Sequence, residues 1–156
     1  MPHWKKRETF FAEYGIELTL PGAWQLRPSD DPIRWFYRSA DHKEYLTISR
    51  RDMEGARKES EEAALMQRAV ARHRRAVELG FGRVPNLTMS EVEYGERLGV
   101  PAGSYMGGAG DEHQFWSVLL FPKGTVWGFF YEAFRFAQDD AEERARVIFE
   151  AIAFRK

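Results

Sequence analysis

The first third of the chain alternates apolar and polar residues in three short runs. Residues 16–20 have the period of two that is typical of a strand with one buried face. Pro21 and Gly22 follow and predict a tight turn, because proline presets its own φ angle and glycine tolerates positive φ. Residues 33–39 and 44–52 repeat the alternation on either side of a polar turn. The pattern predicts one strand followed by a hairpin of two more.

Two later stretches have the period of an amphipathic helix. The first, residues 60–80, begins with acidic residues, which favour the positive end of a helix, and ends in Gly80, a residue preferred just past a helix C-terminus. The second begins at Asp139 or Asp140. Each has one apolar stripe, formed by Met66, Val70, His73 and Val77 in the first and by Val147, Ile148, Ala151 and Ile152 in the second. Both helices are therefore expected to pack on a sheet.

Four further strand-like runs lie between the two helices, at residues 87–97, 100–110, 112–122 and 125–136. Short connections join them and predict antiparallel pairing, because a parallel pair needs a crossover of roughly a dozen residues. The segment 39–87 is the exception, since it holds a helix and could place the third and fourth strands in parallel. The expected fold is α+β: a curved, mainly antiparallel sheet of about six to seven strands flanked by two α-helices.

The length of the chain indicates how many domains it has, and its charge limits the partners it could bind. At 156 residues we expect one core, in a single α+β domain of residues 14–156 after an N-terminal arm of residues 1–13. The 23 basic and 24 acidic residues give a net charge of −1, so no global field attracts nucleic acid or an anionic membrane. A basic cluster on the first helix is interpreted as a solvated face, and consists of Arg68, Arg72, Arg74 and Arg75.

The chain has neither a membrane-spanning apolar run of about 18 residues nor the apolar core of a signal peptide. We therefore expect a cytoplasmic protein that does not insert into membranes. A chain trimmed of its signal peptide would have the same sequence. We also expect a monomer or a weak homodimer.

Residue types that could carry chemistry do not form a recognised motif. The absence of cysteine excludes a thiolate metal site and a thiol nucleophile. Ser104 lies in GSYMG, which departs from the nucleophile elbow G-x-S-x-G, and the glycine-rich GGAGD is followed by a strand pattern rather than a helix. The histidines lack metal-ligand spacing, and Asp111, Glu112 and His113 are interpreted as solvated turn residues. We expect no catalytic residue, no metal and no cofactor.

Three segments resemble the PsbP-like fold family. They are LPGAW after the first strand, YLTISRRD ahead of the first helix and IFEAIAFRK at the end. With the order of strands and helices, they resemble a fold shared with the Ran-binding import factor Mog and with bacterial DcrB-like proteins. They are also similar to the Eag chaperones of type VI secretion effectors. The resemblance covers nearly the whole chain and implies a non-enzymatic binding protein, in which Trp24 packs on the sheet edge as a core plug.

Aromatic residues on the predicted strands suggest a surface for a protein partner. Two helices should cover one sheet face completely and the other in part, which leaves an aromatic surface open. By analogy with the sheet groove of the Eag-like chaperones, we predict that this surface binds an apolar or amphipathic segment of another protein. The predicted partner-binding residues are Trp35, Tyr37, Tyr45, Trp127 and Tyr131. Alternation does not show which face the helices take, so the alternative that these side chains are core stays open.

A second hypothesis is a small-ligand-binding protein or an enzyme with a pocket between sheet and helix. The polar groups that could serve such a pocket are His73, Tyr94 and His113. A closed cavity with converging polar groups would favour this hypothesis. An open aromatic sheet face would instead favour partner binding.

Overall fold

The computed structural model describes residues 15–18, 20, 24–52, 59–81, 84, 86–122 and 124–154. Within these residues the chain forms two helices, α1 (Glu59–Gly80) and α2 (Gln138–Glu150). The strands are β1 (Ile16–Glu17), β2 (Trp24–Arg27), β3 (Arg34–Ser39), β4 (Glu44–Asp52), β5 (Thr88–Met89), β6 (Glu93–Arg97), β7 (Val100–Ala109), β8 (His113–Leu120), β9 (Thr125–Phe134) and β10 (Ala153–Phe154). The predicted arm, residues 1–13, lies outside the described residues, and the domain boundary stays a prediction.

One large sheet dominates the fold. Its strand order is β2-β3-β4-β9-β8-β7-β5, and β6 also pairs with β7. All pairings between the described strands are antiparallel, and β1 and β10 form a separate two-stranded sheet. β4 pairs with β9 along its whole length, so the strands before and after α1 do not form a parallel pair. The predicted α+β class and antiparallel sheet are confirmed, with eight strands in the main sheet.

Two parts of the sheet differ from the predicted strands. Trp24 begins the edge strand β2, which pairs with β3, and its half-buried side chain packs against the core. The run 87–97 is divided into β5 and β6, with Ser90 between them. There the Ser90 backbone N–H donates to the Met106 carbonyl (2.8 Å), and the Ser90 hydroxyl accepts from the Met106 N–H (2.9 Å). A side chain thus replaces a backbone partner where the strand is interrupted.

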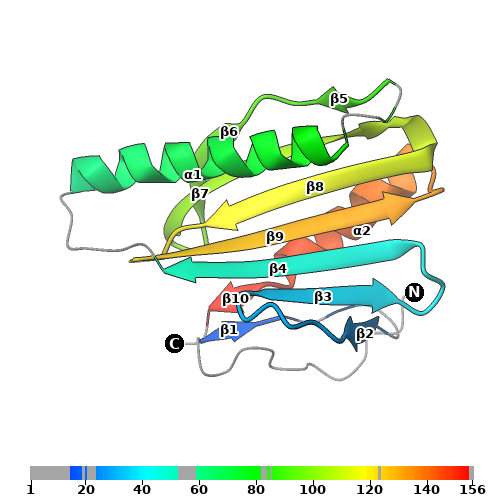
Figure 1. The fold of residues 1–156 in the computed structure, drawn as a ribbon, viewed down its shortest axis with the longest axis horizontal. Coiled ribbons are helices and arrows are strands. Elements are labelled where there is room, and N and C mark those ends of the chain that lie inside the picture. The colour runs from blue at the N-terminus through cyan, green and yellow to red at the C-terminus, as the bar shows by residue number, and fades with distance from the viewer. Residues whose placement is uncertain are drawn as a thin grey trace.

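The two faces of the sheet are covered differently (Figure 1). α2, β1 and β10 cover one face and enclose the larger cluster of buried side chains, which includes Leu46 and Ile148. α1 crosses the other face above β8 and β7, where Val70 and Phe115 belong to a second cluster. In Figure 1, β4, β3 and β2 lie below α1, and neither described helix crosses their front.

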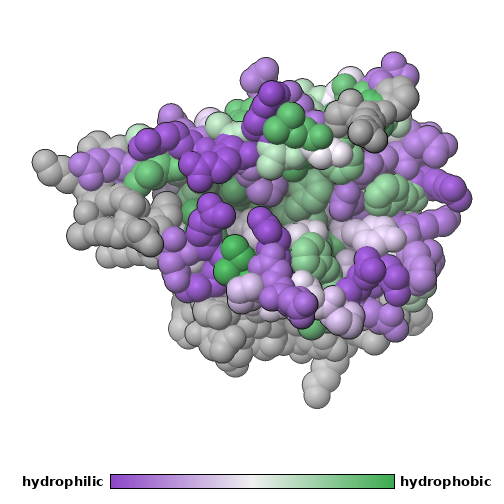
Figure 2. Space-filling model, viewed as in Figure 1, coloured by the Kyte–Doolittle hydropathy of each residue, from purple (hydrophilic) through white to green (hydrophobic). Residues whose placement is uncertain are grey.

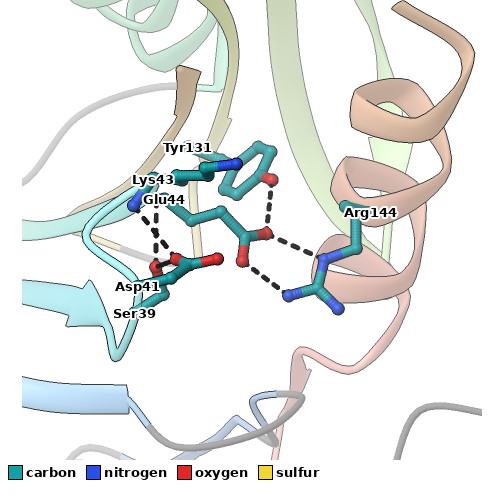
Figure 3. A network of polar contacts seen from close by, with 6 residues as sticks. All are labelled: Ser39, Asp41, Lys43, Glu44, Tyr131 and Arg144. Carbon is teal, nitrogen blue, oxygen red and sulfur yellow. Dashed lines mark hydrogen bonds and ion pairs between the residues drawn. The ribbon is translucent and has the colours of Figure 1, made fainter. Parts of the chain in front are cut away.

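A buried polar contact links α2 to the sheet (Figure 3). Glu44, which is 2% exposed, accepts hydrogen bonds from the Tyr131 hydroxyl (2.7 Å) and from Nε (2.8 Å) and Nη2 (2.6 Å) of Arg144. Burial and then the charge of Glu44 raise the pKa of the Tyr131 hydroxyl, which therefore remains a donor. The neighbouring turn joins the network, because the Ser39 hydroxyl accepts from the Glu44 backbone N–H (3.0 Å) and donates to Asp41 (2.7 Å). β4, β9 and α2 therefore meet at one carboxylate.

Replacing Arg144 with leucine should lower the free energy of unfolding by about 3 kcal/mol, because the buried Glu44 carboxylate would lose its cation. Arg146→Leu is a matched control on the same helix, since Arg146 makes exposed ion pairs with Glu143 and Glu150. It should cost less than about 1 kcal/mol. Urea denaturation of both variants measures the difference, and equal losses would contradict the role given to Glu44 and Arg144.

α1 approaches β7 closely at Gly103. A Cβ atom there would lie 2.8 Å from Cγ2 of Val70, which is fully buried and has little room to move. Gly103→Ala should therefore lower the free energy of unfolding by about 1–3 kcal/mol through overpacking. Gly95→Ala on β6 is the control, because its Cβ would meet no atom within 4 Å. Chemical denaturation compares the two, and a Gly103→Ala variant as stable as Gly95→Ala would mean that α1 is not tightly seated.

Candidate functional site

The α1 side of β2, β3 and β4, with the adjoining part of β9, forms what we call the open face. Its side chains are exposed or half-buried, in contrast to the mostly buried ones on the α2 side of β4 and β9. Figure 2 shows hydrophobic surface framed by hydrophilic side chains below α1. The strand register assigns to this face Gln25, Arg27, Arg34, Phe36, Arg38, Tyr45, Thr47, Ser49, Arg51, Phe130, Glu132 and Phe134.

A groove of about 320 Å³ lies between the open face and α1, and we call it the α1 groove. One wall is helical and mainly apolar, whereas the other is a strand surface with two hydroxyl groups and a guanidinium. The lining residues are His73, Ala76, Val77, Gly80 and Phe81 on the helix side and Arg34, Thr47, Ser49 and Phe130 on the sheet side. The groove can therefore hold an apolar group and hydrogen-bond a polar one at its edge.

His73 is a neutral hydrogen-bonding group in this groove. Burial, and then the positive charge of Arg34, lower the pKa of His73 to about 4. Its Nδ1 contacts the hydroxyl of Tyr105, whose pKa is raised by burial, so the hydroxyl donates and Nδ1 accepts. The ring also packs against Phe130, with 6.0 Å between ring centroids. A pKa near 4 is far from the value near 7 that suits general acid–base catalysis at neutral pH.

A second hollow, of about 600 Å³, lies on the open face by the turn between β3 and β4. Tyr45 packs edge-on against Phe134 here, with ring centroids 5.5 Å apart. His113 stacks on the same Phe134 at 4.1 Å, and its Nε2 lies 3.1 Å from a carboxylate oxygen of Glu132. The lining residues are Asp41, His42, Lys43, Tyr45, Glu132, Phe134 and Arg135. This end of the open face carries charges of both signs.

The five predicted partner-binding residues divide between the two faces. Tyr37, Trp127 and Tyr131 are 4%, 2% and 0% exposed in the core of the α2 side. Trp35 lies on that side too and stacks on Trp127 with 6.2 Å between ring centroids. The packing of α2, β1 and β10 makes this face core, and Tyr45 belongs to the open face. The partner-binding role of the five residues stays a prediction.

Sequence reasoning did not select Arg34, Phe36 and Arg38, which lie at the centre of the open face. They occupy the alternate positions of the strand that supplies Trp35 and Tyr37. A phenylalanine between two arginines on one strand face is typical of a partly exposed surface. This pattern in the sequence could have indicated the open face.

The polar groups considered for a ligand pocket do not converge. His73 lines the α1 groove, whose lining includes neither Tyr94 nor His113, and Tyr94 is 46% exposed on β6. His113 was expected to be a solvated turn residue, and this was wrong: it begins β8, is buried, and packs between Phe81 and Phe134. Within the described part of the chain, no three His, Asp or Glu side chains gather where a metal ion could bind.

A third cavity, of about 420 Å³, lies on the opposite side, between α2 and the strands β7 and β8. Its floor includes the apolar side chains of Trp116, Val118 and Phe149. Among the charged groups at its rim, Arg146 is held by Glu143 and Glu150. Acidic and basic side chains are more evenly mixed at this rim than on the open face.

The low pKa of His73 predicts a pH-dependent contribution to stability. The group titrates near pH 4 in the fold and near pH 6.5 when unfolded, so the unfolded chain binds more protons between these values. The contribution is complete above pH 6.5 and is lost as the pH falls toward 4. The free energy of unfolding of the wild type minus that of His73→Asn should therefore fall between about pH 7 and about pH 4.5. Urea denaturation measures it, with His42→Asn as a control for losing one histidine, and a constant difference would contradict it.

The chain is similar to known proteins in its fold but not in its sequence. No protein-family model matches the chain, and no curated protein does. Among solved structures, the cyanobacterial PsbP (CyanoP) of Synechocystis sp. PCC 6803 has a TM-score of 0.67 and 13% identity, over 96% of this chain and 91% of that one. LpqN of Mycobacterium tuberculosis has a TM-score of 0.55 and 17% identity, over 90% and 83%. The likeness to Mog, the DcrB-like proteins and the Eag chaperones stays a prediction. The order of the elements and these two structures agree that the chain has the PsbP-like fold.

Proposed function

We propose that the protein is a non-enzymatic binding module that holds an apolar or amphipathic segment of another protein on its open face. One observation carries the proposal: α1 covers only part of its side of the sheet. Phe36, Tyr45 and Phe134 therefore remain partly exposed there, close to the hydroxyls of Thr47 and Ser49.

The chemistry of the open face suits a protein segment. Aromatic rings supply apolar area, and hydroxyls and amides at the same surface can pair with the polar backbone of a bound chain. α1 adds a second wall through Val77 and Phe81, so that a side chain in the α1 groove would contact helix and sheet together. A two-sided groove buries more of such a side chain than a flat sheet does.

The fold neighbours support an accessory or binding role. CyanoP is a cyanobacterial PsbP, and LpqN is involved in cell envelope biogenesis. We expect the partner to be a protein rather than nucleic acid, and the chain to be a monomer or weak homodimer. Neither of the two described helices is long and apolar enough to cross a lipid bilayer. The cytoplasmic location stays a prediction.

A small-ligand carrier is the second candidate, and the α1 groove favours it. Its volume of about 320 Å³ lies at the lower end of ligand-binding pockets, which are about 300–1,000 Å³. The groove also presents a neutral histidine, two hydroxyls and a guanidinium to an occupant. The low pKa of His73 favours a carrier over an acid–base enzyme.

Replacing Tyr45 with serine should weaken partner capture about fivefold or more, because it removes an aromatic contact of the open face. Tyr94→Ser is the control, since Tyr94 is 46% exposed on β6, which pairs with β7 and is separated from β4 by β8 and β9. The proteins retained from a lysate of the source organism are quantified for wild type and both variants. The melting temperature of Tyr45→Ser should stay within about 3 °C of wild type, whereas Tyr131→Ser, in the core, should lose roughly 10 °C.

The proposal would be contradicted if Tyr45→Ser and Tyr94→Ser retained the same proteins in the same amounts as wild type. A small molecule that co-purifies in place of a protein, and is detected by native mass spectrometry, would favour the carrier.

A further inference from the structure

We infer that the bound segment is acidic as well as apolar, and that its carboxylates bind a row of arginines on the open face. The inference rests on the proposed function, because it takes a protein segment to be the occupant. Three observations carry it: where the arginines lie, how few acidic partners they have, and the apolar groove that adjoins them.

Four arginines lie on the α1 side of three neighbouring strands, and we call them the arginine row: Arg27, Arg34, Arg38 and Arg51. Arg34 and Arg38 stand on β3, two residues to either side of Phe36. Arg27 of β2 is paired directly with Phe36, and directly paired residues of antiparallel strands share a face. Three arginines therefore neighbour the half-buried Phe36 on one face of the sheet.

The arginine row lacks acidic partners within the part of the chain that the structure describes. Arg27, Arg38 and Arg51 form no ion pair with any described residue, and the Nε of Arg38 is buried without a hydrogen-bond partner. Arg34 pairs with Asp31 at 3.0 Å, but the two side chains are 49% and 27% exposed, and such a pair contributes little. The row is therefore a local concentration of positive charge on a chain whose net charge is −1.

The α1 groove supplies the apolar half of the site. Arg34 lines it together with Val77, Phe81 and Phe130. Guanidinium groups bind carboxylates through two parallel hydrogen bonds, which places the acidic side chain firmly. An acidic residue held by Arg34 would put a neighbouring apolar residue of the same segment at the groove. The matching ligand has acidic residues close to large apolar ones.

A nucleic-acid strand would also be attracted to the arginine row, but the open face suits it less well. Single strands gain much of their affinity by stacking bases on exposed aromatic rings. Phe36 and Phe130 are half-buried within the strand ladder, and Phe130 is also packed against His73. The groove wall of Val77 and Phe81 fits an aliphatic or aromatic side chain instead.

Selection of peptides from a displayed library tests the inference. Random peptides of about twelve residues are selected on the wild type and on two double variants with the same loss of charge. Arg34→Gln/Arg38→Gln changes the row, whereas Arg68→Gln/Arg72→Gln changes exposed residues on the outer side of α1. Wild type and the α1 variant should enrich peptides that combine Asp or Glu with Leu, Phe or Tyr. By fluorescence anisotropy, the row variant should bind a selected peptide about tenfold more weakly, and the α1 variant within about twofold of wild type.

Several outcomes would overturn the inference. If neutral or basic peptides are enriched and Tyr45→Ser abolishes their binding, the proposed function stands and the acidic ligand is wrong. If no peptide is enriched on the wild type, both are wrong. Equal losses in the two arginine variants would mean that net charge rather than the arginine row attracts the peptide. Tighter binding of a single-stranded oligothymidine, lost in the row variant alone, would identify nucleic acid as the ligand.

Discussion

The width of the sheet is the constraint on which the rest of the structure depends. Seven strands side by side span roughly 29 Å at about 4.8 Å per strand, whereas a helix with its side chains is about 10 Å wide. One helix therefore cannot cover a face. α2 is supplemented by β1 and β10, which together bury the larger core. α1 stands alone on the other side and packs over β7 and β8, so β2, β3 and β4 remain uncovered by either described helix.

The polar groups of the two faces differ for the same reason. On the covered face Glu44 cannot reach bulk water, and its oxygens are bonded by Tyr131 and Arg144. On the open face the exposed Arg27 can remain charged without a partner among the described residues because water reaches it, whereas Arg38 is half-buried and its Nε has no hydrogen-bond partner there. The bonds of Glu44 hold β4, β9 and α2 together. The arginines of the open face keep hydrogen-bond donors that a ligand could use. For this reason the open face is the candidate site, rather than the larger cluster of buried side chains on the α2 side.

His73 lies between the buried core and the open face. Its side chain extends from α1 to contact Tyr105 and Phe130, and it also lines the α1 groove. Burial keeps it neutral, so it contributes a hydrogen bond and shape rather than a titrating charge near pH 7. With Gly103 setting how closely α1 approaches β7, the helix forms a firm wall for an occupant of the groove.

The sequence by itself determined the two helices, most of the strands, a mainly antiparallel sheet and the α+β class, because alternation, helical stripes and turn residues are local signals. It also predicted an aromatic partner surface on these strands, and that role stays a prediction. It could not assign their faces: β9 has large apolar residues on both, with Trp127 and Tyr131 on one and Phe130 and Phe134 on the other. Nor did it anticipate that Trp24 begins an edge strand or that His113 is buried, since both depend on contacts with distant residues. Only the tertiary structure decided that α2, β1 and β10 take the side of Trp35, Tyr37, Trp127 and Tyr131, and leave Tyr45 with Arg34 and Arg38 on the open face. The physical reason is that burial is settled by which elements pack on a face, and packing joins residues too far apart in the chain for any periodicity to link.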